Sequence, residues 1–406
     1  MSNNWKKHFS ETAKRSRPSP VREVLKVLGQ PGMISFAGGM PAPEVFPVEQ
    51  FAEGAELLRT QGTTLLQYGT TEGYTPLREF LAKWTAPRLG RETSLDEVLL
   101  TTGSQQLLDL FGWAMIDPGD VIIMEDPTYM AAINAFANHG ASFAAVKMDE
   151  DGMVVSHLPA LIEHIRNEEG RKVKAIYTIV NFQNPAGATM SVERREELVK
   201  IADRYGLVIL EDDPYGYVRF DGNHLPSIFS FDKAGNTIYA GSFSKILSPG
   251  VRIGWVSGDK DIVRQMAIFK QALDLCSSPI TQVLTYEYCR KGYLDAHLPK
   301  IIDNYRTKRD AMEVSFKKHL APLGMSWVKP KGGFFFWLDT GAIDSNELTR
   351  RALEKKVAIL SGAAFCVNPE AGGHSARVNF THSSPEVIEE GVARLAQAVQ
   401  EMKIPA

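Results

Sequence analysis

The amino-acid sequence predicts an α/β fold, in which a mostly parallel sheet lies between helices and a smaller α/β domain follows. Three observations predict it. Short apolar segments typical of buried strands alternate with helical patterns between residues 97 and 257. Alternation of this kind indicates parallel strands covered on both faces. A long helical region then fills residues 260–322, and a second pattern of short strands and helices fills residues 325–402.

The composition is that of an ordinary globular protein. The chain has 406 residues, of which 44% are hydrophobic, so it is long enough for one large domain and a smaller one. Lysine and arginine number 45 and the acidic residues number 48, which gives a net charge of −3. This balance offers no electrostatic reason to bind nucleic acid or an anionic membrane. We therefore expect small-molecule partners.

The cysteines and histidines indicate no disulfide framework and no metal site. Cys276, Cys289 and Cys366 are odd in number and show no C-x-x-C spacing, and the nine histidines show no ligand spacing. The N-terminal residues are polar and basic without an apolar signal core, and no apolar run approaches membrane-spanning length. We expect a soluble protein of the reducing cytoplasm.

The first 46 residues predict an arm and a helix that pack with the smaller domain. Residues 1–17 include five basic residues and predict a surface arm or short helix. Residues 19–28 show an amphipathic helical pattern with a proline at its start, and Arg22 lies off its apolar face. A strand from Ile34 then runs into a Gly/Pro loop that contains Gly39. Such a loop is typical of backbone close to a ligand, and equally typical of a plain connection.

The predicted sheet belongs to a large domain, expected over residues 47–290, and residues 291–406 are expected to form the small domain. The predicted strands are 97–102, 121–125, 142–147, 173–180, 207–211, 237–240 and 253–256. One helix is predicted over residues 191–205, capped by Ser191, and another opens at residues 103–106. The free amides at such a helix start bind phosphate well.

The stretch Gly241–Trp255 places Lys245 and Arg252 in a serine-rich loop between two predicted strands. Strand-end loops are where α/β proteins carry their chemistry. The hydroxyls of Ser242 and Ser244 and the Arg252 guanidinium predict a phosphate cradle. A primary amine beside a phosphate pocket suits Schiff-base formation with a phosphorylated aldehyde such as pyridoxal phosphate. The spacing of a Walker phosphate loop is absent, and a solvated loop lysine is the alternative interpretation.

Four further side chains follow predicted strands, where loops gather ligands. They are Tyr129, Asn184, Asp212 and Tyr215. Ordinary turn chemistry is the alternative interpretation of each residue taken singly. Together they offer a carboxylate for a pyridine nitrogen, hydrogen-bonding groups for a ring oxygen and an aromatic face, all ahead of the lysine. This combination predicts a pyridoxal-phosphate site.

The same chain carries motifs that resemble a known family. These motifs are residues 19–23, 35–43, 67–74 and 103–106, besides Asp212-x-x-Tyr215 and the Lys245 loop. Over nearly its whole length the sequence resembles the class I/II aminotransferases, which are pyridoxal-phosphate enzymes of fold type I. Within them it is most similar to the branch of 2-aminoadipate and kynurenine aminotransferases. The resemblance implies pyridoxal 5'-phosphate as the cofactor.

The resemblance also implies a role for each matching cofactor residue. Lys245 would be the Schiff-base lysine and Asp212 the partner of the pyridine nitrogen. Asn184 and Tyr215 would bind the ring oxygen O3′, and Tyr129 would stack on the ring. The implied phosphate ligands are Ser104, Gln105, Ser242, Ser244 and Arg252.

Five residues match substrate or partner-subunit positions. Arg377 would bind the substrate α-carboxylate beside Gly39 and Asn184, unless it is a surface arginine at a strand edge. Arg22 would contact a distal carboxylate, swinging in for acidic substrates and out for neutral ones, and a surface arginine is again the alternative. Tyr68 would reach the phosphate of the neighbouring subunit, which implies a homodimer with shared sites.

The implied reaction is transfer of an amino group between an L-amino acid and a 2-oxo acid. The resemblance suggests 2-aminoadipate, aromatic or branched aliphatic donors, 2-oxoglutarate as acceptor and a ping-pong scheme. Elimination, decarboxylation or racemisation on the same cofactor is the first alternative. The second is a transcription regulator with an aminotransferase-like domain, for which the stretch ahead of Ile34 is expected to be too short.

Overall fold

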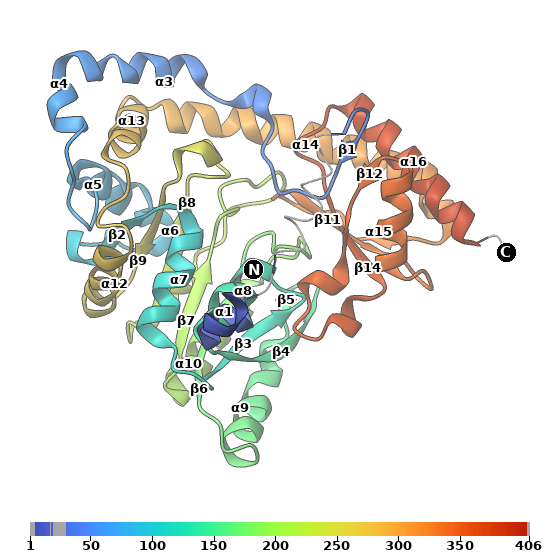
Figure 1. The fold of residues 1–406 in the computed structure, drawn as a ribbon, viewed down its shortest axis with the longest axis horizontal. Helices are drawn as coiled ribbons and strands as arrows, with labels where there is room; N and C mark the ends of the chain where they lie inside the picture. The colour runs from blue at the N-terminus through green and yellow to red at the C-terminus, as the bar shows by residue number, and fades with distance from the viewer. Residues whose placement is uncertain (1–4, 17, 19–29, 404–406) are drawn as a thin grey trace.

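The computed structural model describes residues 5–16, 18 and 30–403 (Figure 1). Its largest sheet has eight strands in the order β2-β9-β8-β7-β6-β3-β4-β5. The strands are β2 Val98–Thr101, β3 Val121–Asp126, β4 Ser142–Asp149, β5 Gly152–Met153, β6 Val173–Thr178, β7 Val208–Asp212, β8 Thr237–Ser242 and β9 Gly254–Ser257.

The middle of this sheet is parallel, as predicted. Strands β4, β3, β6, β7 and β8 pair in parallel, whereas β9 is antiparallel to both β8 and β2. The strand β3 is apolar from Val121 to Met124, and all four side chains are buried, because helices cover both faces. Strand β7 ends one residue later than expected, so that Asp212 is its last residue.

The helices of the N-terminal and central parts pack on the sheet or on one another. They are α1 Glu11–Arg15, α3 Val48–Ala55, α4 Leu57–Leu65, α5 Thr75–Trp84, α6 Ala86–Leu89, α7 Gly103–Met115, α8 Met130–Asn138, α9 Leu158–Asn167, α10 Val192–Tyr205, α11 Ile228–Phe231, α12 Lys260–Leu273 and α13 Pro279–Arg290. The predicted N-cap of α10 is present, since the Ser191 side chain accepts a hydrogen bond from the Arg194 amide. Short 3-10 turns are η1 Trp5–His8, η2 Pro43–Val45, η3 Leu95–Glu97, η4 Val155–His157 and η5 Pro249–Val251.

The C-terminal part forms a second α/β layer. Strands β10 Ser326–Trp327, β11 Phe335–Asp339, β14 Ser375–Asn379 and β13 Leu360–Ser361 make an antiparallel sheet in that order. Its helices are α14 Tyr293–His319, α15 Ser345–Glu354 and α16 Pro385–Lys403, with turns η6 Ala321–Leu323, η7 Gly362–Phe365 and η8 Pro369–Gly372. Buried apolar residues run continuously from the large sheet into this layer, from Leu210 through Phe334 to Leu395.

The N-terminal segment contacts both parts. Strand β1 Ile34–Ser35 pairs in parallel with β12 Val357–Ala358 of the C-terminal part. Helix α1 lies against α8, where the Ser16 hydroxyl is 2.8 Å from the side-chain oxygen of Asn138. The expected helix of residues 19–28, with Arg22, lies entirely outside the described residues. Within the described residues, no helix combines the length and apolarity that a membrane span requires.

Candidate active site

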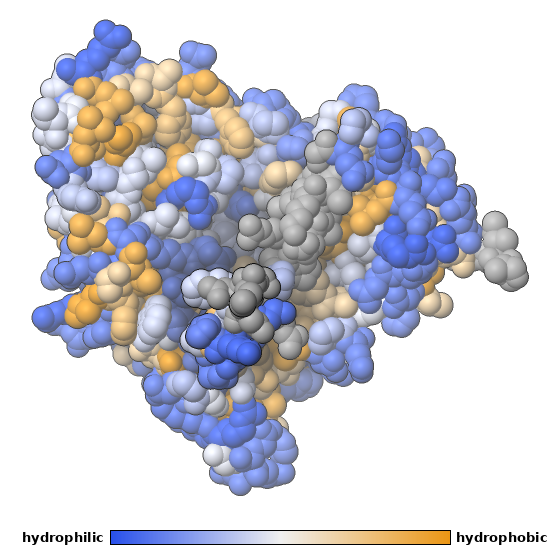
Figure 2. Space-filling model, in the orientation of Figure 1, coloured by the Kyte–Doolittle hydropathy of each residue, from blue (hydrophilic) through white to orange (hydrophobic). Residues whose placement is uncertain are grey.

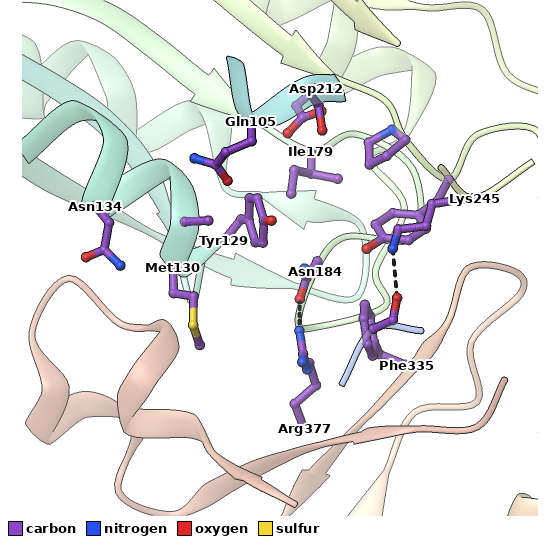
Figure 3. A pocket seen from close by; sticks show the side chains of 15 residues that line it. Gln105, Tyr129, Met130, Asn134, Ile179, Asn184, Asp212, Lys245, Phe335 and Arg377 are labelled. Carbon is purple, nitrogen blue, oxygen red and sulfur yellow. Dashed lines mark hydrogen bonds between the residues drawn. The ribbon is translucent and has the colours of Figure 1, made fainter. Parts of the chain in front are cut away.

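A cavity of about 470 Å³ opens at the carboxyl ends of the parallel strands, between the large sheet and the C-terminal part (Figure 3). This is where ligands bind in open α/β sheets. Nine predicted residues line it, namely Gly39, Ser104, Gln105, Tyr129, Asn184, Asp212, Tyr215, Lys245 and Arg377. The fold therefore brings together, around one cavity, residues that lie as far apart in the sequence as Gly39 and Arg377.

Lys245 lies in the loop after β8, with its amine in the cavity. Its Nζ donates a hydrogen bond of 2.7 Å to the carbonyl oxygen of Gly39. Burial lowers the pKa of Lys245 to about 8, and the positive charges of Arg377 and Arg252 act in the same direction. The amine is therefore unprotonated at a lower pH than an ordinary lysine, which suits a nucleophile or a general base.

Asp212 points into the cavity from the end of β7. Its Oδ2 accepts a hydrogen bond of 2.8 Å from the Tyr177 hydroxyl, while its Oδ1 is buried and has no partner among the described residues. Burial raises the pKa of Asp212 to about 7, against the effect of the Tyr177 hydrogen bond and with that of Asp213. A buried carboxylate oxygen without a partner calls for a donor from a bound group.

Arg377 on β14 enters the cavity opposite the sheet. Its Nη1 donates to Asn184 Oδ1 at 2.8 Å and its Nη2 to the Ala37 carbonyl oxygen at 2.6 Å. The guanidinium lies over the rings of Phe335 and Phe365, at 4.1 and 4.7 Å from their centres. Burial lowers its pKa to about 10, so it remains a cation at neutral pH. It is a fixed, buried cation with planar donors suited to a carboxylate.

The two predicted tyrosines complete the walls. Tyr215 and Tyr129 are enclosed on the cavity side, and burial raises the pKa of both hydroxyls. The Asn184 side chain hydrogen-bonds to Tyr215 and to Arg377, so it joins the two ends of the cavity. Both phenols therefore stay protonated and can donate hydrogen bonds at neutral pH.

The predicted phosphate ligands lie at one end, around the start of helix α7. Ser104 and Gln105 line the cavity there, whereas Ser242, Ser244 and Arg252 lie next to it without lining it. Arg252 reaches the start of α7, where its Nη2 is 3.3 Å from the Thr102 carbonyl oxygen. A Cβ atom at Gly103 would come within 2.5 Å of this guanidinium and would displace it, and the positive φ of 74° also favours glycine there. The free amides of a 13-residue helix and a neighbouring arginine form an anion site.

Pyridoxal phosphate fits this set of groups. An anion site suits the phosphate, the free oxygen of Asp212 suits a protonated pyridine nitrogen, and Lys245 lies at the same cavity. These features are observed in the described residues and do not depend on the resemblance.

Among the predicted residues that the structure describes, Tyr68 also does not line the cavity of its own chain. Tyr68, between α4 and α5, is 78% exposed. Arg22 lies outside the described residues, so its predicted swing has no structural counterpart here.

Several cavity residues were not predicted. They are Met130, Ala131, Asn134, Ile179, Pro214 and Phe335. Met130 and Asn134 are four residues apart and therefore share one face of α8, a spacing visible in the sequence. Tyr177 is the hydrogen-bond partner of Asp212. In the sequence it looks like any other aromatic residue of a buried strand. Nothing local distinguishes it.

The fold and this cavity define a pyridoxal-phosphate enzyme of fold type I. Residues 36–395 match the family described as aminotransferase class I and II, and the chain belongs to that family. It is a pyridoxal-phosphate-dependent aminotransferase of the branch that includes the aminoadipate and kynurenine aminotransferases. The family, fold class, cofactor and enzyme class inferred from the sequence are thus confirmed.

The similar proteins cover almost the whole chain. Aromatic-amino-acid aminotransferase 1 of Thermococcus litoralis is 43% identical over 401 residues, which are 98% of this chain and 95% of the relative. The 2-aminoadipate transaminase of Thermus thermophilus is 38% identical over 402 residues, 98% of each chain. The solved kynurenine aminotransferase of Pyrococcus horikoshii, in complex with PMP, is 41% identical with a TM-score of 0.94 over 99% of both chains.

Proposed function

We propose that this aminotransferase moves an amino group from 2-aminoadipate, an aromatic or a branched aliphatic L-amino acid to 2-oxoglutarate by a ping-pong scheme. One observation carries the proposal: Lys245, Asp212 and Arg377 face one buried cavity from three different strands or strand ends. Transamination requires a base, a carboxylate that keeps the pyridine nitrogen of the cofactor protonated, and a cation that binds the substrate carboxylate. The names of the similar enzymes suggest the range of donors.

The chain's own residues divide the work. When bound, pyridoxal phosphate supplies an aldehyde carbon and an electron-withdrawing ring. Asp212 would keep the ring nitrogen protonated, and Asn184 and Tyr215 would hydrogen-bond O3′. Tyr129 would stack on the ring, and Ser104, Gln105, Ser242, Ser244 and Arg252 would hold the phosphate. Lys245 would attach the cofactor through Nζ, and when displaced would take the proton from the substrate Cα.

The donor and the acceptor would use the same cavity in turn. Both carry an α-carboxylate, which Arg377 would bind beside Gly39 and Asn184. Among the described lining residues, the cations are Lys245 and Arg377, and both have a role already. A distal carboxylate therefore needs another cation, and we assign this role to Arg22.

The test is a panel of L-amino acids, each incubated with 2-oxoglutarate and the cofactor-loaded enzyme. We expect glutamate and the matching 2-oxo acid in equal amounts, and parallel lines in double-reciprocal plots, as a ping-pong scheme requires. Release of ammonia, of carbon dioxide or of the D-amino acid in place of glutamate would favour the elimination, decarboxylation or racemisation alternatives.

We also propose a homodimer in which Tyr68 completes the partner's site. Apolar side chains gather over α3 and α4 (Figure 2), and Val48, Leu58, Leu66 and Tyr68 are exposed there. Exposed apolar clusters of this kind mark protein interfaces. Light scattering should give twice the 45.0 kDa chain mass. Mixing Tyr68→Phe and Lys245→Ala chains tests the sharing, because only mixed dimers contain one site with both native residues.

The domain boundaries are a further proposal. Residues 1–46 would form an arm and a helix that pack with the small domain, 47–290 would form the large cofactor-binding domain and 291–406 would form the small domain. The pairing of β1 with β12 supports the first assignment, and the contact of α1 with α8 adds a second attachment, to the large domain. Limited proteolysis that cuts first near residue 290 would support the boundary.

A further inference from the structure

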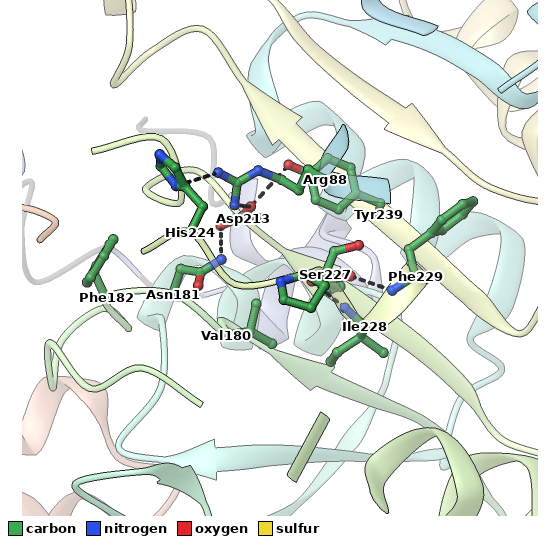
Figure 4. Close-up of polar contacts among 12 residues, drawn as sticks. Arg88, Val180, Asn181, Phe182, Asp213, His224, Ser227, Ile228, Phe229 and Tyr239 are labelled. Carbon is green, nitrogen blue, oxygen red and sulfur yellow. Dashed lines mark hydrogen bonds and ion pairs between the residues drawn. The ribbon is translucent and has the colours of Figure 1, made fainter. Parts of the chain in front are cut away.

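Behind Asp212 lies a buried ion pair that the proposed chemistry does not use (Figure 4). Glu211, Asp212 and Asp213 are consecutive and all are at most 3% exposed. Side chains alternate along a strand, so Asp212 faces the cavity while its two neighbours face the other side of the sheet. Three adjacent buried carboxyl groups need compensation, because like charges in a low dielectric oppose one another's ionisation.

The two rear carboxylates are compensated differently. Glu211 accepts hydrogen bonds from the backbone amides of Ile228 and Phe229, both at 3.0 Å, and the charge of the buried Arg195 favours its ionised form without an ion pair. Asp213 instead forms an ion pair, in which Arg88 Nη1 lies 3.0 Å from its Oδ2. The Tyr239 hydroxyl donates to the same oxygen at 3.1 Å, and Asn181 Nδ2 donates to Oδ1 at 2.8 Å. The Asp213 carboxylate therefore accepts hydrogen bonds from three side chains, one of them charged.

Arg88 is buried, and several groups that contact it suit a cation, although its Nε has no partner among the described residues. It comes from α6 and is 8% exposed. Its guanidinium lies 4.1 Å from the centre of the Tyr217 ring. Its Nη2 is 3.4 Å from His224 Nδ1, and burial together with Arg88 lowers the pKa of His224, so this imidazole is neutral and can accept. No second cation competes for Asp213 at hydrogen-bond distance among the described residues.

Gly216 leaves room for this ion pair because it has no side chain. A Cβ atom built on Gly216 would overlap both Arg88 Nη1 and the Asp213 carboxylate oxygens. The φ angle of Gly216 is not positive, so glycine is required here for space and not for backbone conformation. Gly216 follows Tyr215, which lines the cavity, and precedes Tyr217, which covers Arg88. The turn that carries Asp212 and Tyr215 is thus packed directly on the ion pair.

We propose that Arg88 and Asp213 are positioning residues, which hold the Asp212–Tyr215 turn in place and neutralise the charge next to Asp212. The inference rests on the proposed role of Asp212 toward the pyridine nitrogen. The titratable groups that face Asp212 are Tyr177 from β6, Glu125 from β3, Tyr129 and Tyr215, besides Asp213 itself. None of these is a cation, although Lys245 and Arg377 line the same cavity. The charges of Arg195 and Arg219 also act on Asp213, but Arg88 forms the ion pair with it. Loss of Arg88 would therefore weaken the compensation of Asp213 and would favour protonation of Asp212.

The experiment measures the Kd of the cofactor-free enzyme for pyridoxamine phosphate, which binds without a covalent bond to Lys245. Equilibrium dialysis is done between pH 6 and 9 on Arg88→Met, Asp213→Asn and the double variant. We expect Arg88→Met to weaken binding about fivefold at pH 7 and nearly tenfold at pH 6, as a rise of about one unit in the Asp212 pKa from about 7 implies. The pH below which binding falls should move upward. The double variant, which lacks both charges, should regain most of the affinity.

Two controls separate this role from plain packing. Arg78→Met removes an equally buried guanidinium whose hydrogen bonds, within the described part of the chain, go to the carbonyl oxygens of Val98 and Leu95, and it should leave Kd and its pH profile unchanged. Gly216→Ala displaces the ion pair while keeping both charges, and it should weaken binding even if Arg88→Met does not fold. A folded Gly216→Ala variant with native Kd overturns the proposal, as does a double variant that binds as poorly as Arg88→Met.

The same binding assay, done on Asp212→Asn, tests the proposed role of Asp212 separately. If Asp212→Asn binds pyridoxamine phosphate as tightly as the native enzyme, the role of Asp212 is wrong. If Asp212→Asn binds weakly while Arg88→Met binds normally at every pH, only the positioning role is wrong.

Discussion

The Lys245 amine and the Gly39 carbonyl oxygen are 2.7 Å apart, although the two residues are separated by 206 positions. This hydrogen bond joins the loop after β8 to the loop after β1, which pairs with the C-terminal part. The hydrogen bond thus holds the amine at the junction of the two sheets. Its position and its lowered pKa both follow from burial at that junction.

Replacement of Lys245 by alanine should abolish covalent attachment of the cofactor without abolishing its binding. The phosphate end at α7 and the Asp212 oxygen remain in the variant. We expect Lys245→Ala to retain pyridoxal phosphate on dialysis but to show no borohydride-fixed adduct in the intact mass. An adduct fixed elsewhere on the chain would show that another lysine carries the cofactor.

Asp212 and Asp213 should differ in their importance. Asp212 faces the cavity, whereas Asp213 faces Arg88. We expect Asp212→Asn to lower kcat for transamination by about 100-fold or more, the size of loss seen when a preorganised electrostatic partner is removed. Asp213→Asn should be milder. The opposite order in steady-state assays would mean that the two residues have been assigned in the wrong register.

The Lys245 amine should react at a lower pH than an ordinary lysine. Its pKa is lowered to about 8, and only the deprotonated amine is nucleophilic. In the cofactor-free enzyme, trace acetylation of Lys245 followed by peptide mass spectrometry should therefore reach half its maximum near pH 8, not near the usual value of about 10.4. Arg377→Met removes a neighbouring positive charge and should move this midpoint upward. A midpoint that stays near the usual value in the native enzyme contradicts the assignment.

Arg22 should distinguish acidic from neutral substrates. Arg377 can hold the α-carboxylate of every substrate, but a second fixed cation in the cavity would disfavour apolar donors through desolvation. We expect Arg22→Ala to raise KM for 2-oxoglutarate and 2-aminoadipate by a factor corresponding to about 1–3 kcal/mol, the usual strength of a charge-assisted hydrogen bond. KM for leucine or an aromatic donor should change little. Equal changes for all substrates, or none, would exclude this role.

Much of this protein can be predicted from local patterns in its sequence. The apolar run of β3, the Ser191 cap of α10 and the Asp212-x-x-Tyr215 spacing are all set by neighbouring residues. Periodicity, caps and turn chemistry act within a few positions, so a single sequence reveals them. The same local motifs were sufficient to indicate the cofactor, the family and the fold class.

The tertiary structure alone decided which distant residues meet. Arg377 bonds to Asn184 across 193 positions, and Arg88 pairs with Asp213 across 125. Neither arginine has a local pattern that marks it as buried, because a buried cation is stable only where the folded chain supplies its acceptors. The lowered pKa of Lys245 and the raised pKa of Asp212 have the same origin, since both result chiefly from loss of water around the group, and burial exists only after the two sheets have packed together.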